Sequence, residues 1–319
     1  MNAFAGQHVL SLNQYGRADL ELLFDTADEV GRELAKGDVR RDLDGKILMS
    51  AFFDKSTRTR LAHETAMLRL GGTVSGFADA EVTRASGSTQ ESSDDVFRML
   101  ALYGDVIVTR HPVTGEPARV SESMDNALVI NAGDGTGEHP TQALVDLYTM
   151  RQRFGSIDGL TIALVNDLRM RCTRSLLRGL RRYDCTVRCV AARGMHMDPV
   201  LRAEVEGAGR TITFHDDLVG LLPELDVVYS SPTVAAELPE DAVPRPAAGE
   251  LPLSRELLEA AGKDSLTVMH PLPRKEELPV DVDDTPYNGY FQQAANGITV
   301  RMALLRLMLG EPDAGRSAA

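Results

Sequence analysis

The chain alternates short apolar segments rich in β-branched residues with longer segments in which apolar residues recur at helical spacing. In the first half the apolar segments are residues 46–53, 72–77, 105–109 and 127–131, with helical spacing at 57–70, 92–103 and 140–153. In the second half they are residues 160–165, 186–191, 211–214, 227–230 and 266–270. Strands that are apolar on both faces and joined by helices are typical of parallel sheets covered on both sides. The pattern therefore predicts an α/β fold of doubly wound parallel sheets.

A break in this alternation predicts two domains in the 319-residue chain. The letters FGSIDG at 154–159 interrupt a helical segment and precede a new strand. We predict one domain at residues 1–153 and a second at 154–291, with a helix at 292–309 that crosses back to the first. A helix at 18–36 also lies outside the alternation and suits the same kind of crossing. Since open parallel sheets bind ligands beyond the carboxyl ends of their strands, two such domains predict an interdomain cleft.

Charge and composition restrict the classes of partner. The chain has 34 Lys and Arg against 47 Asp and Glu, a net charge of -13, which disfavours nucleic acid and anionic membranes. No apolar run approaches the roughly 18 residues of a membrane span, and the N-terminus lacks the pattern of a secretory signal. Cys172, Cys185 and Cys189 form neither a disulfide framework nor a zinc-type spacing. We therefore expect a cytoplasmic protein with reduced, mostly packed thiols and no metal site.

Hydroxyl and arginine side chains follow the first predicted strand. The run Ser56, Thr57, Arg58, Thr59 and Arg60 opens the helix predicted at 57–70. The free N–H groups of a helix N-terminus attract anions, and arginine adds charge and bidentate hydrogen bonding. The run predicts an oxyanion or phosphate cradle without a glycine loop, and the alternative is an N-cap with solvated arginines.

Two more motifs follow strands of the first half. Arg110 stands in T-R-H-P after the third strand, and its structural alternative is a surface ion pair. After the fourth strand, N-A-G-D-G at 131–135 leads to His139 and Gln142 in H-P-T-Q. Because proline favours the first helical turn, His139 is a plausible N-cap residue, where the helix dipole favours a neutral imidazole that donates a hydrogen bond. A structural capping histidine is the alternative.

The second half carries H-P-L-P-R at 270–274, after the last predicted strand. Its two prolines lack N–H donors and force extended backbone. Carbonyl oxygens of this segment are thereby left to accept hydrogen bonds from a ligand N–H. A rigid loop is the structural alternative.

Together these motifs, in this order and spacing, resemble the aspartate and ornithine carbamoyltransferase family, and H-P-L-P-R points to the catalytic chain of its aspartate branch. The likeness covers nearly the whole chain, with NAGDG at 131–135, DLYTM at 146–150 and YFQQAANGI at 290–298. It implies transfer of the carbamoyl group of carbamoyl phosphate to an amine, in an interdomain cleft and without a metal or redox cofactor.

The resemblance also implies roles for individual residues. The phosphate would be held by Ser56, Thr57, Arg58, Thr59 and Arg110. The carbamoyl oxygen, which gains negative charge during attack by the amine, would face Thr59, Arg110 and His139. The carbamoyl NH₂ would donate to Gln142 and to the backbone carbonyls of Pro271 and Leu272. Arg58, Thr59, Arg110 and His139 would then be the catalytic residues, acting by positioning and electrostatics.

The residues expected to bind the amine that accepts the carbamoyl group depart from the family pattern. The aspartate branch has a loop lysine that reaches a neighbouring subunit's site, whereas the corresponding loop at 83–91 offers only Arg84 as a cation. The family's acceptor-binding arginine falls at Cys172, with Arg171 one residue early. A further arginine and glutamine of the family are absent from residues 229–236.

Other arginines lie close to this departure. Arg169 and Arg171 are candidates for binding an acceptor carboxylate. For the helically spaced residues Arg174, Arg178 and Arg182 we expect a solvated stripe.

Three functions remain open from the sequence. The departures favour a carbamoyltransferase for an acceptor other than aspartate, such as a diamino acid in a specialised pathway. The alternatives are a true aspartate carbamoyltransferase of pyrimidine biosynthesis and a non-catalytic paralogue that binds or scaffolds. The resemblance further implies a homotrimer with active sites at subunit interfaces.

Overall fold

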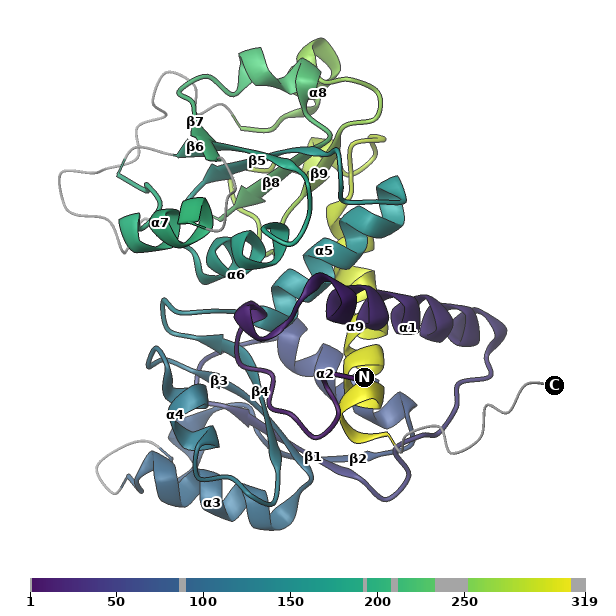
Figure 1. Ribbon diagram of the computed structural model, residues 1–319, viewed down its shortest axis with the longest axis vertical. Coiled ribbons are helices and arrows are strands. Elements are labelled where there is room, and N and C mark those ends of the chain that lie inside the picture. Colours follow the sequence, from purple (N-terminus) through teal and green to yellow (C-terminus); the bar gives the residue numbers. More distant parts are fainter. Residues whose placement is uncertain (1, 86–89, 192–193, 208–211, 233–251, 311–319) are drawn as a thin grey trace. The chain divides into compact units, whose positions relative to one another are not determined.

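The computed structural model describes residues 2–85, 90–191, 194–207, 212–232 and 252–310 (Figure 1). Its strands are β1 (Ile47–Phe52), β2 (Thr73–Phe77), β3 (Val106–His111), β4 (Leu128–Asp134), β5 (Thr161–Asn166), β6 (Thr186–Ala191), β7 (Ile212–Phe214), β8 (Val227–Ser231) and β9 (Thr267–Met269). Its α-helices are α1 (Arg17–Lys36), α2 (Arg58–Arg69), α3 (Ser93–Tyr103), α4 (Glu116–Ser121), α5 (Pro140–Phe154), α6 (Arg171–Leu180), α7 (Pro199–Gly207), α8 (Arg255–Ala261) and α9 (Tyr290–Leu309). Within these residues, no helix has the length and hydropathy needed to cross a bilayer.

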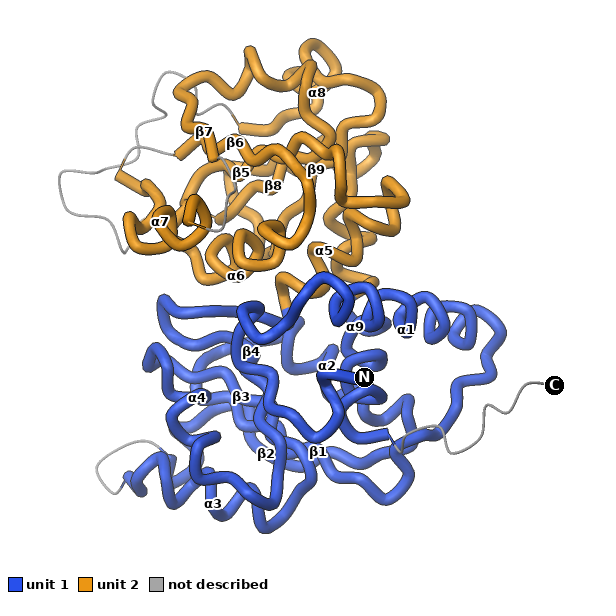
Figure 2. Tube along the Cα trace, in the orientation of Figure 1, with its two compact units in different colours: residues 1–141, 297–319 blue, residues 142–296 orange. Residues whose placement is uncertain are grey.

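The chain forms two compact units (Figure 2). Unit 1 comprises residues 1–141 and the segment from 297 onward, and unit 2 comprises residues 142–296. Both boundaries fall inside helices, because α5 begins in unit 1 and α9 ends there. The helix expected to cross back to the first domain thus corresponds to α9. In contrast, α1 lies wholly within unit 1, so the expectation that it crosses is wrong.

Unit 1 is built on a four-stranded parallel sheet of order β2-β1-β3-β4. The chain moves from β1 to β2 on one side and then returns to β3 on the other. Since crossovers between parallel strands are right-handed, this reversal puts the connecting helices on opposite faces. Met49, Ile107 and Val129 pack on α3 through Phe97, which is fully buried.

The edge strand β2 differs from the expectation of strands apolar on both faces. Thr73, Ser75 and Gly76 are exposed, because β2 pairs only with β1 in the described sheet. The two strands approach closely at Gly76, where a Cβ atom would lie 2.1 Å from the carbonyl oxygen of Ser50. The residues of β2 therefore suit close backbone packing against β1, and they are not apolar on both faces.

Unit 2 contains a five-stranded parallel sheet of order β7-β6-β5-β8-β9. Here the direction of strand addition reverses between β5 and β8, which are paired from Ile162 with Val227 to Asn166 with Ser231. Val165, Val228, Leu258 and Leu266 belong to the buried core on this sheet. The predicted α/β class with two parallel sheets is confirmed.

The surroundings of the three cysteines predict which thiol reacts. Cys172 and Cys189 are buried, and burial raises the pKa of Cys172 to about 11 and that of Cys189 to about 12, whereas Cys185 is partly exposed. Because the thiolate is the nucleophile, alkylation near pH ~8 should label Cys185 alone in the native protein and all three thiols after denaturation. Peptide mass mapping provides the measurement. Native labelling of Cys172 as fast as that of Cys185 would contradict this burial.

Candidate functional site

The carboxyl edge of the unit 1 sheet gathers the predicted motifs of the first half. Phe52 of β1 pairs with Arg110 of β3, and Thr109 pairs with Asn131 of β4. The chain leaves β1 for the N-terminus of α2, and leaves β4 for the loop that ends at α5. Parallel strands in this register deliver all three segments to one edge of the sheet.

Thr59, Arg110 and His139 come together at this edge. The Arg110 guanidinium donates to Thr59 Oγ1 at 2.9 Å and to His139 Nε2 at 3.0 Å, and these two acceptors lie 3.4 Å apart. Thr59 and His139 are buried, and Arg110 is half-buried. Arg110 Nε also donates to the carbonyl oxygen of Ala132 at 3.0 Å, which fixes the plane of the guanidinium. The cluster is a preformed set of polar groups of the kind that stabilises an oxyanion.

The tautomer of His139 differs from the expected one. A guanidinium only donates hydrogen bonds, so Nε2 must accept from Arg110 and the ring proton lies on Nδ1. Thr141 Oγ1, 3.4 Å from Nδ1, is placed to accept that proton. The expected donor role toward a ligand oxygen requires the proton on Nε2 instead. A ligand must therefore displace the Arg110 N–H from this nitrogen.

Ser56, Thr57 and Arg58 lie at the N-terminus of α2. Ser56 is half-buried, whereas Thr57 and Arg58 are exposed. Thr57 occupies the N-cap position without a side-chain capping bond, so the simple capping alternative is not seen. Desolvation by surrounding protein lowers the pKa of Arg58, although arginine remains protonated at neutral pH. An anion bound here would meet the free N–H groups of α2 and the Arg58 charge.

The loop before His139 is braced by Asp134, a residue that the sequence analysis did not single out. This buried carboxylate accepts from the backbone N–H groups of Gly115 and Glu138, both at 2.6 Å, and from Asn131 Nδ2 at 3.0 Å. Gly135 follows at φ +40°, where a Cβ atom would lie 2.6 Å from the carbonyl oxygen of Pro112. The N-A-G-D-G motif is the sequence signal that could have identified this brace.

In unit 2, a second polar network contacts the residues that were predicted to accept hydrogen bonds from a ligand NH₂. Gln142 in the first turn of α5 donates its Nε2 to Asp146 at 2.7 Å. Pro271 and Leu272 are half-buried, and Leu272 has φ +54°, a strained value for a branched residue. Its N–H donates to His270 Nδ1 at 2.8 Å, which supports the strained turn.

A carboxylate supports His270 from the other side. His270 Nε2 lies 3.1 Å from Glu277, and both residues are buried. Burial alone would raise the pKa of Glu277, but hydrogen bonds from His270 and from the Lys275 N–H outweigh it and lower that pKa. The imidazole therefore connects the turn at Leu272 to an ionised carboxylate.

The candidate acceptor residues lie between β5 and α6. Arg169 forms a two-point ion pair with the buried Asp167, Nε to Oδ1 at 2.9 Å and the second contact at 2.8 Å. A bound carboxylate would have to share Arg169 with Asp167. Arg171 is half-buried at the first residue of α6. Cys172, at the family's arginine position, is buried and carries a raised pKa, so it presents a neutral thiol.

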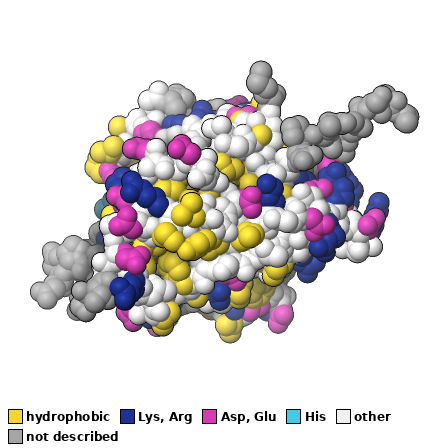
Figure 3. Space-filling view, turned by 90° about the horizontal axis from the view of Figure 1, so that it is seen from below, with side chains coloured by type: hydrophobic (Ala, Val, Ile, Leu, Met, Phe, Trp, Pro, Cys, Tyr) yellow, Lys and Arg dark blue, Asp and Glu magenta, His cyan; other side chains and the backbone are white. Residues whose placement is uncertain are grey.

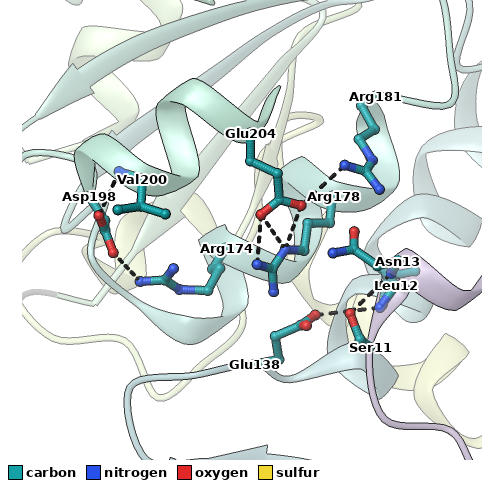
Figure 4. A network of polar contacts seen from close by, with 10 residues as sticks. All are labelled: Ser11, Leu12, Asn13, Glu138, Arg174, Arg178, Arg181, Asp198, Val200 and Glu204. Atoms are coloured by element: carbon teal, nitrogen blue, oxygen red, sulfur yellow. Dashed lines mark hydrogen bonds and ion pairs between the residues drawn. The ribbon is translucent and has the colours of Figure 1, made fainter. Parts of the chain in front are cut away.

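The remaining arginines of α6 and of the residues just after it do not form a solvated stripe, which corrects that expectation. Figure 4 shows Arg178 and Arg181 converging on Glu204 and Arg174 on Asp198. Their contacts measure 2.7, 3.1 and 3.0 Å, and the three arginine side chains are less than a fifth exposed. Arg182 is half-buried as well. The acidic partners come from α7 and the segment before it, beyond the reach of a helical-spacing argument.

Arg84 was predicted to be the only cation of the loop at 83–91. It is exposed, and its carbonyl accepts from the Glu91 N–H at 2.8 Å. Two segments differ from the family pattern, at 83–91 and 229–236. Their residues 86–89 and 233–236 are outside the described residues. Elsewhere in the structure, no group of three or more His, Cys, Asp or Glu side chains is arranged to hold a metal ion.

Comparison with known proteins matches both halves of the chain. Residues 7–152 match the carbamoyl-P binding domain of aspartate/ornithine carbamoyltransferases, and residues 158–308 match the Asp/Orn binding domain of the same family.

Individual relatives resemble the chain over nearly all of its length. The aspartate carbamoyltransferase catalytic subunit of Thermococcus gammatolerans is 40% identical, covering 96% of this chain and 98% of the relative. That of Haloarcula marismortui is 41% identical, covering 95% and 98%. Aspartate transcarbamoylase from Trypanosoma cruzi, solved with carbamoyl phosphate and aspartate, superposes with a TM-score of 0.90 at 33% identity, covering 97% and 98%.

The contacts of His139 predict its tautomer in the ligand-free protein. Nitrogen-15 NMR of the ring should show Nδ1 protonated and Nε2 unprotonated, because Arg110 donates to Nε2. Arg110→Met is the control, since it removes the donor and should yield a mixture of tautomers. A protonated Nε2 in the wild-type protein would contradict the arrangement.

Proposed function

Because the chain belongs to the aspartate/ornithine carbamoyltransferase family, whose members transfer carbamoyl groups, we propose that it is an aspartate carbamoyltransferase. The observation that carries the donor half is the buried cluster of Thr59, Arg110 and His139 beside the N-terminus of α2. The observation that carries the acceptor is identity of about 40% to catalytic subunits named for aspartate, over nearly the whole chain.

Carbamoyl phosphate presents three groups, and the proposal assigns residues to each. Its phosphate binds the N–H groups and side chains of the α2 N-terminus, Ser56, Thr57, Arg58 and Thr59, together with Arg110. Its carbonyl oxygen takes hydrogen bonds from Thr59, Arg110 and His139, once the ligand has displaced Arg110 from Nε2 and the ring proton has moved from Nδ1 to Nε2. Its NH₂ donates to Gln142, Pro271 and Leu272.

The chemistry follows from that placement. The amine nitrogen attacks the carbonyl carbon, the C–O bond to phosphate breaks, and the amine proton leaves with the phosphate. Negative charge grows on the carbonyl oxygen as the nitrogen approaches, so preorganised donors there lower the barrier. Arg58 and Arg110 also stabilise the charge of the departing phosphate.

For the acceptor, the comparisons favour aspartate over the changed acceptor that the sequence departures suggested. A carbamoyltransferase for a different amine is the second candidate function, and one observation favours it. The family's arginine position holds the neutral Cys172, and the nearby Arg169 is already paired with Asp167. Recognition of two carboxylates needs cations, because an unpaired carboxylate in a desolvated site is costly. Arg171 and Arg84 are the proposed sources of that charge.

We propose a cytoplasmic homotrimer in which Arg84 serves a neighbouring subunit's site. Exposed apolar side chains on α2 and α3 support association, namely Leu61, Leu68, Met99, Leu102 and Tyr103. Figure 3 shows a face of the molecule on which hydrophobic side chains gather with charged groups around them. Exposed apolar patches of this kind mark association surfaces.

Removal of Arg58 tests the donor site. Arg58→Ala should weaken carbamoyl phosphate binding at least tenfold, because a charged hydrogen bond contributes roughly 1.5–3 kcal/mol. Calorimetry measures the affinity, and Arg69→Ala, at the other end of α2, is the matched control. Equal affinity of Arg58→Ala and wild type would remove this residue from the phosphate site.

An acceptor panel tests the function itself. With saturating carbamoyl phosphate, phosphate release should be fastest with aspartate and slower with mono-carboxylate and diamino acids. A diamino acid exceeding aspartate would select the second candidate. Binding of carbamoyl phosphate without turnover of any amine would indicate a non-catalytic paralogue.

The variant Cys172→Arg further distinguishes an enzyme that uses aspartate from one that uses a different amine. It should leave the order of acceptors unchanged if aspartate is already preferred, and should shift it toward aspartate if the acceptor has changed.

A further inference from the structure

We propose that Asp146, which no predicted role includes, is a positioning residue for the carbamoyl NH₂ of the donor. Its side chain is fully buried in α5, one turn after Gln142. Oδ1 accepts from Gln142 Nε2 at 2.7 Å and from Gln293 Nε2 at 2.6 Å, and Oδ2 accepts from the Tyr229 hydroxyl at 2.9 Å. The inference rests on the proposed function, in which Gln142 accepts from that NH₂.

The first consequence concerns the orientation of the Gln142 amide. A glutamine carries a donor NH₂ and an acceptor oxygen on one planar group, and its two orientations are otherwise nearly equivalent. The contact with Asp146 fixes the Gln142 NH₂ toward the carboxylate. A flipped amide would instead place Oε1 about as close to a carboxylate oxygen, and two acceptors repel each other. Oε1 is then the atom that Gln142 presents to a ligand. Asp146 thereby makes Gln142 an acceptor, which is what a carbamoyl NH₂ requires.

The second consequence concerns the turn at 270–272. Gln293, near the start of α9, accepts the His270 backbone N–H through Oε1 at 2.9 Å while its Nε2 binds Asp146. His270 in turn accepts the Leu272 N–H through Nδ1. One carboxylate therefore sets both Gln142 and, through Gln293, the turn whose carbonyls are the other proposed acceptors. Buried networks in which each member is satisfied hold a single geometry.

Tyr229 gives a matched control, because it binds the same carboxylate without touching either glutamine in these contacts. Burial and the nearby Asp146 charge raise the pKa of Tyr229 well above its ordinary value, so its hydroxyl stays protonated and donates. Tyr229→Phe removes one hydrogen bond from Asp146 and the contact with Cys172, and leaves both amide contacts. It matches the loss of a buried hydrogen bond without altering the orientation of Gln142.

The test compares two ligands that differ at the NH₂ alone. Carbamoyl phosphate carries the NH₂, and acetyl phosphate carries a methyl group in its place. The ratio of their dissociation constants, measured by calorimetry without an amine, isolates the NH₂ contact. Asp146→Ala should reduce the wild-type preference for carbamoyl phosphate about tenfold, as Gln142→Ala should, since one hydrogen bond is worth on the order of that factor. Tyr229→Phe should keep the preference.

A conservative variant and a double variant separate positioning from general support of the fold. Asp146→Asn can keep its oxygen toward both glutamines and turn its NH₂ to the Tyr229 oxygen, so it should retain most of the preference. In a Gln142→Ala background, Asp146→Ala should change the ratio less than it does in the wild-type background, because only the route through Gln293 and the turn is left. An unchanged ratio in Asp146→Ala, or equal weakening of both ligands, would overturn the proposal.

Two further outcomes are covered. Should Asp146→Ala fail to fold, amide exchange in the wild type decides, because Gln142 side-chain protons held by a buried carboxylate should exchange slowly with solvent. Fast exchange would overturn the positioning role. Failure of the proposed function has a different signature, namely a wild-type protein that binds neither ligand or does not prefer the NH₂.

Discussion

The constraint on which the rest of this molecule depends is that parallel strands end together. Pairing between β1, β3 and β4 fixes where these strands end, at Phe52, His111 and Asp134, so the segments that follow them start from the same edge of the sheet. The segments that carry residues 56–59, 110 and 139 of the proposed donor site are thus brought to one edge by the backbone hydrogen bonds of the sheet. The side chains need only to be correct in type, since the sheet supplies their proximity.

Two buried carboxylates convert that coarse placement into fixed geometry. Asp134 holds the loop that leads to His139, and Asp146 holds amide groups on α5 and α9. Burying a carboxylate without hydrogen bonds costs free energy, so each of these carboxylates is surrounded by donors. The hydrogen bonds order the segments that carry those donors. Asp134 binds backbone N–H groups of the loop before His139, and Asp146 binds the side-chain amides of Gln142 and Gln293.

Sequence reasoning located the elements well where the signal was local. Strand positions and the helix at 140–153 follow from apolar periodicity, and the donor motifs follow from hydroxyl and arginine residues at strand ends. It failed where the partner is remote in sequence. The pairing of Arg178 with Glu204, the Arg110 bond to His139 Nε2 and the burial of Asp146 all depend on contacts between segments that no periodicity connects. The exposure of β2 likewise follows from its place in the strand order, which the strand's own residues do not encode.

The path of α9 has a consequence for synthesis of the chain. Unit 1 is discontinuous, and its last segment includes Arg306, which pairs with Glu33 of α1 at 2.8 Å. A ribosome releases residues in order, so the final turns of α9 emerge only after the whole of unit 2. Domains that are contiguous in sequence can fold as they emerge. Unit 1 is not contiguous, so it cannot complete its packing until α9 has followed unit 2, and loss of that helix would remove the partner of Glu33.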